Sequence, residues 1–413
     1  MSSYPITSVR SAFPALSGAQ PTPVYLDNPA GTLVPRVVVS AVADAMETAS
    51  SNLGAYFDAS RRADAIWTEA HRAAADLLGA ASEREIIIGP NMTTLTMHLS
   101  RSIGRALSPG DEIIVTRMDH EGDISPWLLL AEDLGLVVKW LPFNTETWRI
   151  EPEDLVSLLT PRTRLLAINH ASNMTGSIND ITTLSALAKD AGAWVYVDGV
   201  QFVPHLLPDV QALGCDFYAC SSYKFFGPHL GIVWGREELL AALEPYKCRC
   251  TSDELPVRFE TGTPQTELLA GLTATIDYLA TLGDDVDTAD TRRARLKKGY
   301  ARFSDHELGL SRKLIAGLEQ LPGITVHGIR NPNRFSWRVP TISFTHAQVS
   351  THQIARTLAQ QRINVWSGHN YALEPARHLG LDEDEGVVRI GIAHYNTEDE
   401  IDRTLNAIET VVR

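Results

Sequence analysis

Between about residues 80 and 235 the chain alternates short runs rich in β-branched residues with longer amphipathic segments. This alternation is typical of βαβ units, in which helices cover both faces of a mainly parallel sheet. Ligands of such sheets bind at the carboxyl ends of the strands, where the loops gather. The sequence therefore predicts an α/β fold and the edge at which a site should lie. The expected strands are EIII (85–88), EIIVT (112–116), LVVKWL (136–141), RLLAIN (164–169), WVYVD (194–198), DFYAC (216–220) and GIVWG (231–235).

After about residue 280 the pattern changes to that of a small α+β unit. Residues 310–328 pass from a helical pattern into a strand, and residues 341–345 form a second β-branched run. Residues 352–366 again pass from helix to strand, and residues 397–413 predict a closing helix. A chain of 413 residues is long enough for one large and one small domain. We expect an N-terminal segment (1–20) packed with the small domain, a large domain (21–280) and a small C-terminal domain (281–413).

Charge and composition restrict the partners of the chain. The 36 Lys and Arg residues against 50 Asp and Glu residues give a formal net charge of −14, which argues against nucleic acid or an anionic membrane as partner. The first residues lack the basic and apolar regions of a secretory signal, and no apolar run is long enough to span a bilayer. Four cysteines (Cys215, Cys220, Cys248 and Cys250) are too few for a disulfide scaffold and lack a metal-binding spacing. We therefore expect a cytoplasmic protein without a metal site.

The most informative stretch is VYVDGVQFVPH followed by CDFYACSSYKFFGPHLGIVWG. Asp198 ends one predicted strand and Lys224 lies just past the end of another, so both side chains should emerge at the same edge of the sheet. An aldehyde cofactor needs a lysine that can lose its proton and form an imine. The pyridine nitrogen of such a cofactor needs a carboxylate that keeps it protonated. Asp198 and Lys224 meet both needs.

The order D-G-x-Q-x-x-P-H, D-F-Y and S-x-x-K-x-x-G-P resembles the central block of cysteine desulfurases and their class V aminotransferase relatives. The resemblance extends from VYLDNPAGT (24–32) to VRIGIAHYNTEDEID (388–402). It implies the fold of the fold-type I PLP-dependent transferases, with a mainly parallel seven-stranded sheet flanked by helices in a large domain and a small α+β C-terminal domain. It also implies pyridoxal 5'-phosphate as the cofactor and a homodimer with shared active sites.

The resemblance assigns roles around the cofactor ring, residue by residue. Lys224 holds the cofactor as a Schiff base, and Asp198 pairs with the pyridine nitrogen. Gln201 contacts the phenolic oxygen of the ring. His120, in MDHEGDISPW, stacks on the ring and relays protons, and Asn173, in NHASNMTG, reaches the cofactor or the substrate.

The resemblance also places donors around the phosphate. Thr93 and Thr94 follow a predicted strand and open a helix, so their hydroxyl and N–H groups would lie at a helix N-terminus. Ser221 matches the phosphate-binding serine of the family, and Tyr223 stands where many desulfurases have histidine. Thr263, in RFETGTP, matches a threonine that reaches the phosphate of the neighbouring subunit.

Arg389 matches the arginine that grips the α-carboxylate of the substrate, which a planar guanidinium does with two hydrogen bonds. Purely structural interpretations compete with all these roles. His120 and Asn173 are residue types that make ordinary turns, and Arg389 can form an ion pair. The threonines and Ser221 can cap helices.

The chain departs from the desulfurase pattern in the loop WSGHNYALEP (366–375). One large branch of desulfurases has R-x-G-H-H-C there, so Trp366 takes the place of the arginine and Tyr371 that of the cysteine. A phenol cannot carry a persulfide, because the reaction needs a thiolate. Cys248 and Cys250 are the only possible substitutes, and both Trp366 and Tyr371 suggest a bulkier or more aromatic substrate.

The resemblance implies a PLP-dependent lyase or transferase that acts on a small α-amino acid through an external aldimine, with Lys224 moving the proton at Cα. The leading hypothesis is a C–S lyase that works by β-elimination. Transamination, epimerisation and decarboxylative C–C bond formation are alternatives within the family. Two others are a desulfurase that uses Cys248 or Cys250 and a catalytically silent PLP-binding scaffold.

Overall fold

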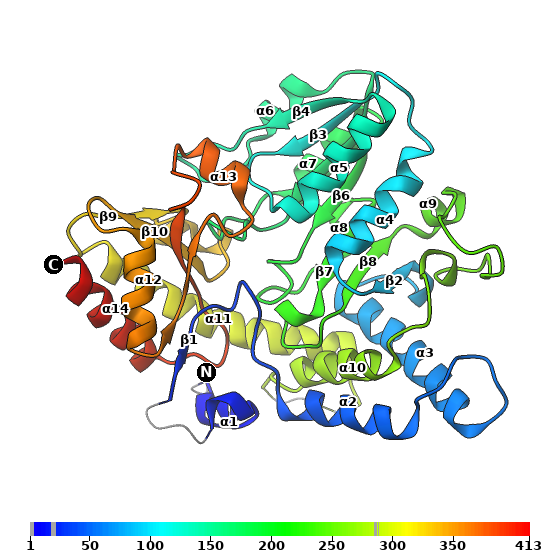
Figure 1. The fold of residues 1–413 in the computed structure, drawn as a ribbon, viewed down its shortest axis with the longest axis horizontal. Coiled ribbons are helices and arrows are strands. Elements are labelled where there is room, and N and C mark those ends of the chain that lie inside the picture. The colour runs from blue at the N-terminus through cyan, green and yellow to red at the C-terminus, as the bar shows by residue number, and fades with distance from the viewer. Residues whose placement is uncertain (1–3, 18–21, 285–286, 288) are drawn as a thin grey trace.

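The computed structural model describes residues 4–17, 22–284, 287 and 289–413, and its centre is a seven-stranded sheet (Figure 1). All seven predicted runs form strands of this sheet. Strand β8 is antiparallel to its neighbours β2 and β7, whereas the other pairs are parallel. The predicted α/β fold with a mainly parallel seven-stranded sheet is thus confirmed. In spatial order the strands are β2 (Ile86–Gly89), β8 (Gly231–Gly235), β7 (Phe217–Ser221), β6 (Trp194–Asp198), β5 (Thr163–Asn169), β3 (Glu112–Thr116) and β4 (Val137–Leu141).

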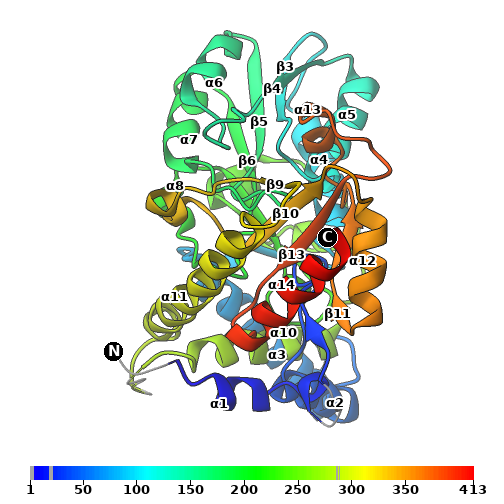
Figure 2. The ribbon, with the colours of Figure 1, turned by 90° about the vertical axis from the view of Figure 1, so that its left-hand side faces the viewer.

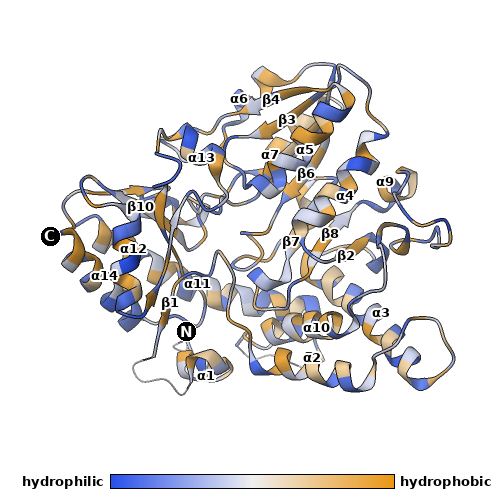
Figure 3. Cartoon of the chain, viewed as in Figure 1, coloured by the Kyte–Doolittle hydropathy of each residue, from blue (hydrophilic) through white to orange (hydrophobic). Residues whose placement is uncertain are grey.

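Helices cover both faces of the large sheet, because alternate residues of each buried strand point to opposite sides. Ile113 and Phe217 pack with α4 (Met92–Gly104) and α5 (Glu121–Leu134) on one face. Their neighbours Ile114 and Tyr218 pack on the other face with α3, α7 and α10. Figure 3 shows the strands of the sheet as mostly apolar and the helices as mixed. The helices around this sheet also include α2 (Arg36–Thr48), α3 (Asp58–Leu78), α6 (Pro152–Leu158), α7 (Ile181–Asp190), α8 (Val210–Leu213), α9 (Glu237–Ala242) and α10 (Thr266–Ala280).

A second, four-stranded antiparallel sheet has the order β12-β13-β10-β9 (Figure 2). The predicted succession of helix, strand, strand, helix and strand is present, and the closing helix is α14 (Glu398–Val412). The sequence pattern did not predict the strand β13, which lies between β12 and β10. The elements are β9 (Ile324–His327), β10 (Thr341–His346), α12 (Thr351–Gln360), β11 (Ile363–Asn364), β12 (Trp366–Gly368), α13 (Leu373–His378) and β13 (Val387–Gly391).

Helix α11 (Arg292–Leu318) connects the two hydrophobic cores. Tyr300 and Phe303, near its start, pack in the core of the large sheet. Leu310 and Leu314, further along, pack in the core of the small sheet. The predicted boundary at residues 280 and 281 stays a prediction, with α11 shared between the cores.

The N-terminal part of the chain contacts the core of the large sheet and helix α14. Helix α1 (Ile6–Ser11) is followed by Phe13, which packs in the core of the large sheet. Arg10 forms an ion pair of 2.9 Å with Glu400 of α14. The predicted segment 1–20 also includes residues 1–3 and 18–20, which lie outside the described residues.

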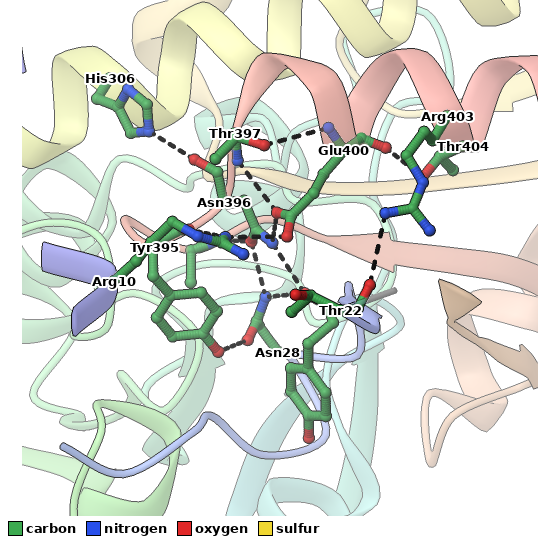
Figure 4. Close-up of polar contacts among 12 residues, drawn as sticks. Arg10, Thr22, Asn28, His306, Tyr395, Asn396, Thr397, Glu400, Arg403 and Thr404 are labelled. Carbon is green, nitrogen blue, oxygen red and sulfur yellow. Dashed lines mark hydrogen bonds and ion pairs between the residues drawn. The ribbon is translucent and has the colours of Figure 1, made fainter. Parts of the chain in front are cut away.

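A buried polar network fixes the segment that follows strand β1 (Val24–Tyr25) to the small sheet (Figure 4). The amide of Asn28 donates to the carbonyl oxygen of Gly391 at 2.8 Å, and the hydroxyl of Tyr395 donates to the other end of this amide. Asn396 donates to the carbonyl of Tyr25 at 3.0 Å and to Glu400 at 2.9 Å. The backbone that follows Asn28 is thereby held in one position.

In the described ranges, no helix combines the length and the apolar character that crossing a membrane requires. The cytoplasmic location stays a prediction.

Replacing Asn28 with alanine should lower the free energy of unfolding by about 1–3 kcal/mol, because buried polar groups lose their partners. Asn28 is 3% exposed, and its removal deprives the Tyr395 hydroxyl and the Gly391 carbonyl of one hydrogen bond each. Thermal or urea unfolding of Asn28→Ala measures the loss. Asn52→Ala, at an exposed position, is the matched control. Equal stability of the two variants would contradict the role of this network.

Candidate active site

A cavity of about 390 Å³ lies at the carboxyl ends of β5, β6 and β7. Most of the residues singled out from the sequence meet there, although they come from both sheets. The cavity is lined by Thr93, His120, Asn173, Asp198, Gln201, Ser221, Tyr223, Lys224, Trp366, Tyr371 and Arg389. Pro29, Ala30 and Asn370 also line it and were not expected.

Lys224 ends a short 3-10 helix (Ser222–Lys224) directly after β7. Its Nζ donates to the carbonyl oxygens of Pro29 and of Ala30, the latter at 3.1 Å. Burial, together with the positive charge of Arg389, lowers the pKa of Lys224 from 10.5 to about 7. A large fraction of this amine is therefore neutral near neutral pH, as an attack on an aldehyde requires. The contacts of Pro29 and Ala30 are made by backbone atoms, which explains why side-chain patterns did not reveal them.

Asp198 is the last residue of β6 and is buried. Its Oδ1 accepts the N–H of Val200 at 2.8 Å. Burial raises the pKa of Asp198 to about 6, while the Val200 N–H and the charge of Lys224 oppose the rise. The carboxyl is thus mainly ionised at neutral pH and suits a protonated ring nitrogen.

His120 is the N-cap of α5, and its Nδ1 accepts the N–H of Gly122 at 2.8 Å. Burial lowers its pKa to about 3, and the charges of Lys224 and Arg389 add to the effect. The imidazole is therefore neutral. Its ring is stacked with that of Tyr371 at a centroid distance of 5.6 Å.

Arg389, in β13, brings the only guanidinium among the described residues that line this cavity. Nη1 donates to the carbonyl of Asn173 at 3.2 Å, and Nη2 lies 3.6 Å from Oδ1 of Asp27. Burial lowers the pKa of Arg389 to about 10, so the group stays charged. Nε of Arg389 and Oδ1 of Asn173 are buried, and neither has a hydrogen-bond partner in the described part of the chain. Both atoms are suited to a bound ligand.

The predicted phosphate-binding residues fall into two groups. Thr93, Ser221 and Tyr223 line the cavity beside the N-terminus of α4, where the N–H of Met92 lies 3.4 Å from the Ser221 hydroxyl. Thr94 and Thr263 instead line a second cavity of about 520 Å³. The N–H of Thr94 is already bonded to the side chain of Asn91 at 2.8 Å.

Gln201 is buried, and its amide donates to the hydroxyl of Thr341 at 3.0 Å. Thr341 belongs to β10, so this bond joins the large sheet to the small one. The side chain of Gln201 nevertheless lines the cavity, as its predicted contact with a cofactor ring requires.

Strand β12 and the loop after it form the mouth of the cavity. Trp366 is 54% exposed and Tyr371 68% exposed, although both line the cavity. The loop is attached to the large sheet, because Asn173 donates to the carbonyl of Asn370 at 2.9 Å and the N–H of Glu121 to that of Tyr371 at 2.8 Å. No cysteine belongs to the described lining of the cavity.

The four cysteines are free and lie in two settings. Cys215 and Cys220 are buried, and burial raises the pKa of the Cys220 thiol above its ordinary value. Cys248 and Cys250 are exposed, in the segment that follows α9. Across the described ranges, no group of three or more His, Cys, Asp or Glu side chains is arranged to hold a metal ion.

Comparisons with known proteins agree with the geometry of the site. The sequence model of the family described as aminotransferase class-V matches residues 24–404. The chain belongs to the class V aminotransferases. An aminotransferase-like protein of Gibberella zeae, FGM3, is 34% identical over 420 residues, which cover 100% of this chain and 99% of the relative. A cysteine desulfurase of Pectobacterium carotovorum is 31% identical over 430 residues, with coverage of 100% and 99%.

A solved structure supports the same assignment. The cysteine desulfurase CsdA from Escherichia coli superposes with a TM-score of 0.86 at 28% identity, covering 99% of each chain. The chain therefore has the fold of the fold-type I PLP-dependent enzymes and is itself a PLP-dependent enzyme. The cavity fits pyridoxal 5'-phosphate, since a lysine with a lowered pKa, a buried carboxylate and the N-terminus of α4 surround it.

Lys224→Ala should remove the covalent attachment of pyridoxal 5'-phosphate, because Lys224 is the lysine that lines the cavity with a lowered pKa. After borohydride reduction and digestion, mass spectrometry should find the cofactor on the Lys224 peptide of the unaltered enzyme and on no peptide of the variant. The control is Lys297→Ala, which replaces an exposed lysine and should be labelled at Lys224 like the unaltered enzyme. Full labelling of Lys224→Ala would mean that another lysine holds the cofactor.

Proposed function

We propose that this enzyme removes a β-substituent from a free α-amino acid, with cleavage of a C–S bond as the leading reaction. One observation carries the proposal: the cavity contains a proton-accepting amine and a guanidinium but, in its described lining, no thiol. The amine and the guanidinium suit chemistry at Cα of an amino acid. A desulfurase would need a thiolate as well.

Three residues have different roles in the proposed reaction. Arg389 binds the α-carboxylate through two N–H groups and so fixes which bond at Cα lies perpendicular to the cofactor ring. Lys224 removes the proton at Cα, for which a lowered pKa is favourable. His120, as a neutral imidazole, covers the ring and keeps water from it. The bound cofactor supplies an electron sink, helped by the carboxylate of Asp198.

The fate of the sulfur follows from the residues at the mouth. Tyr371 stands where the desulfurase loop has its cysteine, so the sulfur would leave on the substrate fragment. Trp366 and Tyr371 offer two exposed aromatic faces at the entrance. Substituents larger than a hydrogen on the sulfur, aromatic ones included, can pack against them.

Transamination is a second candidate, because the relative from Gibberella zeae is described as aminotransferase-like. It uses the same residues up to the loss of the Cα proton. The two reactions differ in the nitrogen: elimination releases ammonia, whereas transamination keeps the amino group on the cofactor.

Cysteine and its S-methyl, S-allyl and S-benzyl conjugates should each give a thiol (sulfide from cysteine), pyruvate and ammonia in equal amounts. The thiol is measured with a chromogenic disulfide, and the other two products with coupled dehydrogenases. Cys248→Ser/Cys250→Ser should release them at the same rate, because neither cysteine lines the cavity.

Two outcomes would contradict this reaction. Loss of sulfide release from cysteine in Cys248→Ser/Cys250→Ser would favour a desulfurase. An oxo acid that forms in one turnover without ammonia, and continues only with an added oxo acid, would favour transamination.

We also propose that the enzyme is a homodimer with shared active sites. Thr263 lines the second cavity, which has no lysine in its described lining. Near it, large apolar side chains are exposed on the surface, Tyr56 at 91% and Phe57 at 57%, and Met46 of α2 is exposed at 62%. Exposed apolar groups of this kind mark interfaces. A partner on this surface would bring Thr263 to the phosphate in the other subunit.

Tyr56→Glu/Phe57→Glu should weaken the dimer by at least tenfold, about 1.4 kcal/mol, since buried charges would be unpaired. Analytical ultracentrifugation over a dilution series measures the dissociation constant. Val156→Glu, an exposed valine of α6, is the control and should behave like the unaltered enzyme. An unaltered enzyme that sediments as a monomer at micromolar concentration would contradict the dimer.

A further inference from the structure

Three carboxyl groups are buried together at the inner side of the active-site cavity. Asp119 lies in the turn between β3 and α5 and is 1% exposed, and Asp123 lies in the first turn of α5 and is also 1% exposed. Asp198, at the end of β6, is 4% exposed. Only Asp198 lines the cavity, so the other two have no direct role in the reaction proposed above.

Asp119 and Asp123 have few partners, and these are neutral. The hydroxyl of Thr116 donates to Oδ2 of Asp119, and the indole of Trp127 donates to Oδ1 of Asp123 at 3.3 Å. Oδ1 of Asp119 and Oδ2 of Asp123 are buried without a hydrogen-bond partner in the residues that the structure describes. Burying an ionised carboxyl without a cation is costly.

The cations on the surrounding elements are engaged elsewhere. Lys139 of β4 is 2.7 Å from Glu112, and Arg164 of β5 is 3.4 Å from Asp111. On α4, Arg101 is exposed and His98 bonds the carbonyl of Tyr246. In the turn before α5, Arg117 pairs with Glu374.

The other titratable groups that face the pair are acids or Tyr196. Burial first, and then the charges of Asp198 and Glu121, raise the pKa of Asp119 well above the ordinary value. Burial and the charges of Asp119 and Asp198 do the same for Asp123. Tyr196 of β6 faces Asp123, and its hydroxyl lies 2.7 Å from that of Thr96 on α4. None of these groups stabilises an anion at Asp123.

Asp198 differs from the pair because one of its stabilising neighbours is a cation. The neighbours that lower the pKa of the pair are uncharged: the Thr116 hydroxyl and the Asn169 N–H act on Asp119, and the Trp127 indole acts on Asp123. The N–H of Val200 and the charge of Lys224 hold its pKa at about 6, against the rise that burial causes. The positive end of α5 favours an anion at Asp123. Full burial and two neighbouring carboxyl groups disfavour that anion.

We propose that Asp119 and Asp123 remain neutral carboxylic acids in the folded enzyme at neutral pH and leave Asp198 as the single negative charge behind the cofactor ring. They are positioning residues, which act through Asp198 on the ring nitrogen. If they ionised, their repulsion would drive a proton onto Asp198, and the ring nitrogen would lose its anionic partner. This inference rests on the proposed pairing of Asp198 with the ring nitrogen.

Infrared difference spectroscopy tests the protonation directly. The enzyme saturated with pyridoxal 5'-phosphate is compared at pH 7 with Asp123→Asn, Asp119→Asn and the control Asp133→Asn, an exposed aspartate of the same helix. Each of the first two variants should lose one carboxylic-acid C=O stretching band, whereas Asp133→Asn should lose only carboxylate bands. Loss of carboxylate bands in Asp123→Asn and Asp119→Asn would overturn the proposal.

The pH dependence of stability gives a second test. A raised pKa in the folded state means that the penalty is absent well below the pKa of an unfolded aspartate, about 3.9, begins near pH 4 and grows as the pH rises. Asp123→Asn should therefore melt within about 1 °C of the unaltered enzyme near pH 4 and about 2–4 °C or more above it at pH 7. A gain that shrinks with rising pH would mean an ionised, stabilised Asp123 and would overturn the proposal.

The absorption spectrum of the bound cofactor separates this inference from the proposed pairing. At pH 7, Asp123→Asn should keep the visible band of the unaltered enzyme, whereas Asp198→Asn should shift it. A shift in Asp123→Asn as large as that in Asp198→Asn would overturn the neutral pair. No shift in Asp198→Asn would instead overturn the pairing, while the infrared and melting results would still stand by themselves.

Discussion

The burial of the Lys224 amine is the constraint on which the surrounding structure depends. An amine that loses water must find other acceptors for its N–H groups, and the backbone carbonyls of Pro29 and Ala30 provide them. Those carbonyls belong to the segment that follows β1, pairs with β13 of the small sheet through Asp27 and is fixed by Asn28. The reactivity of one side chain thus requires the N-terminal segment, β13 and the end of β7 to be in place together.

The same requirement explains why the site lies between two sheets. The large sheet provides Asp198 and Lys224 at neighbouring strand ends, which sets their spacing rigidly. The small sheet provides Arg389, which can be positioned separately for the substrate. In the proposed function, chemistry and substrate recognition are carried by different sheets, and the loop 366–375 contacts the large domain through Asn370 and Tyr371. A change of substrate can arise in that loop without any change at Lys224.

Much of the fold and of the site could be predicted from the sequence, for local reasons. The strands could be predicted because buried parallel strands are short β-branched runs. Lys224 and Asp198 could be predicted to lie together because the carboxyl ends of the strands gather at one edge of the sheet. The second cavity around Thr263 was not visible, since it depends on how α3 and α4 pack. The backbone contacts of Ala30 and the burial of Asp123 could not be predicted from the sequence either, because both depend on packing between segments that are far apart in the chain.

Helix α11 gives the molecule a property that neither sheet has alone. Its 27 residues span about 40 Å and pack into one hydrophobic core at the start and into the other at the end. Melting either core would remove the packing from half of a continuous helix and weaken the hydrogen-bonded turns of the remainder. We therefore expect the two cores to be coupled in their unfolding.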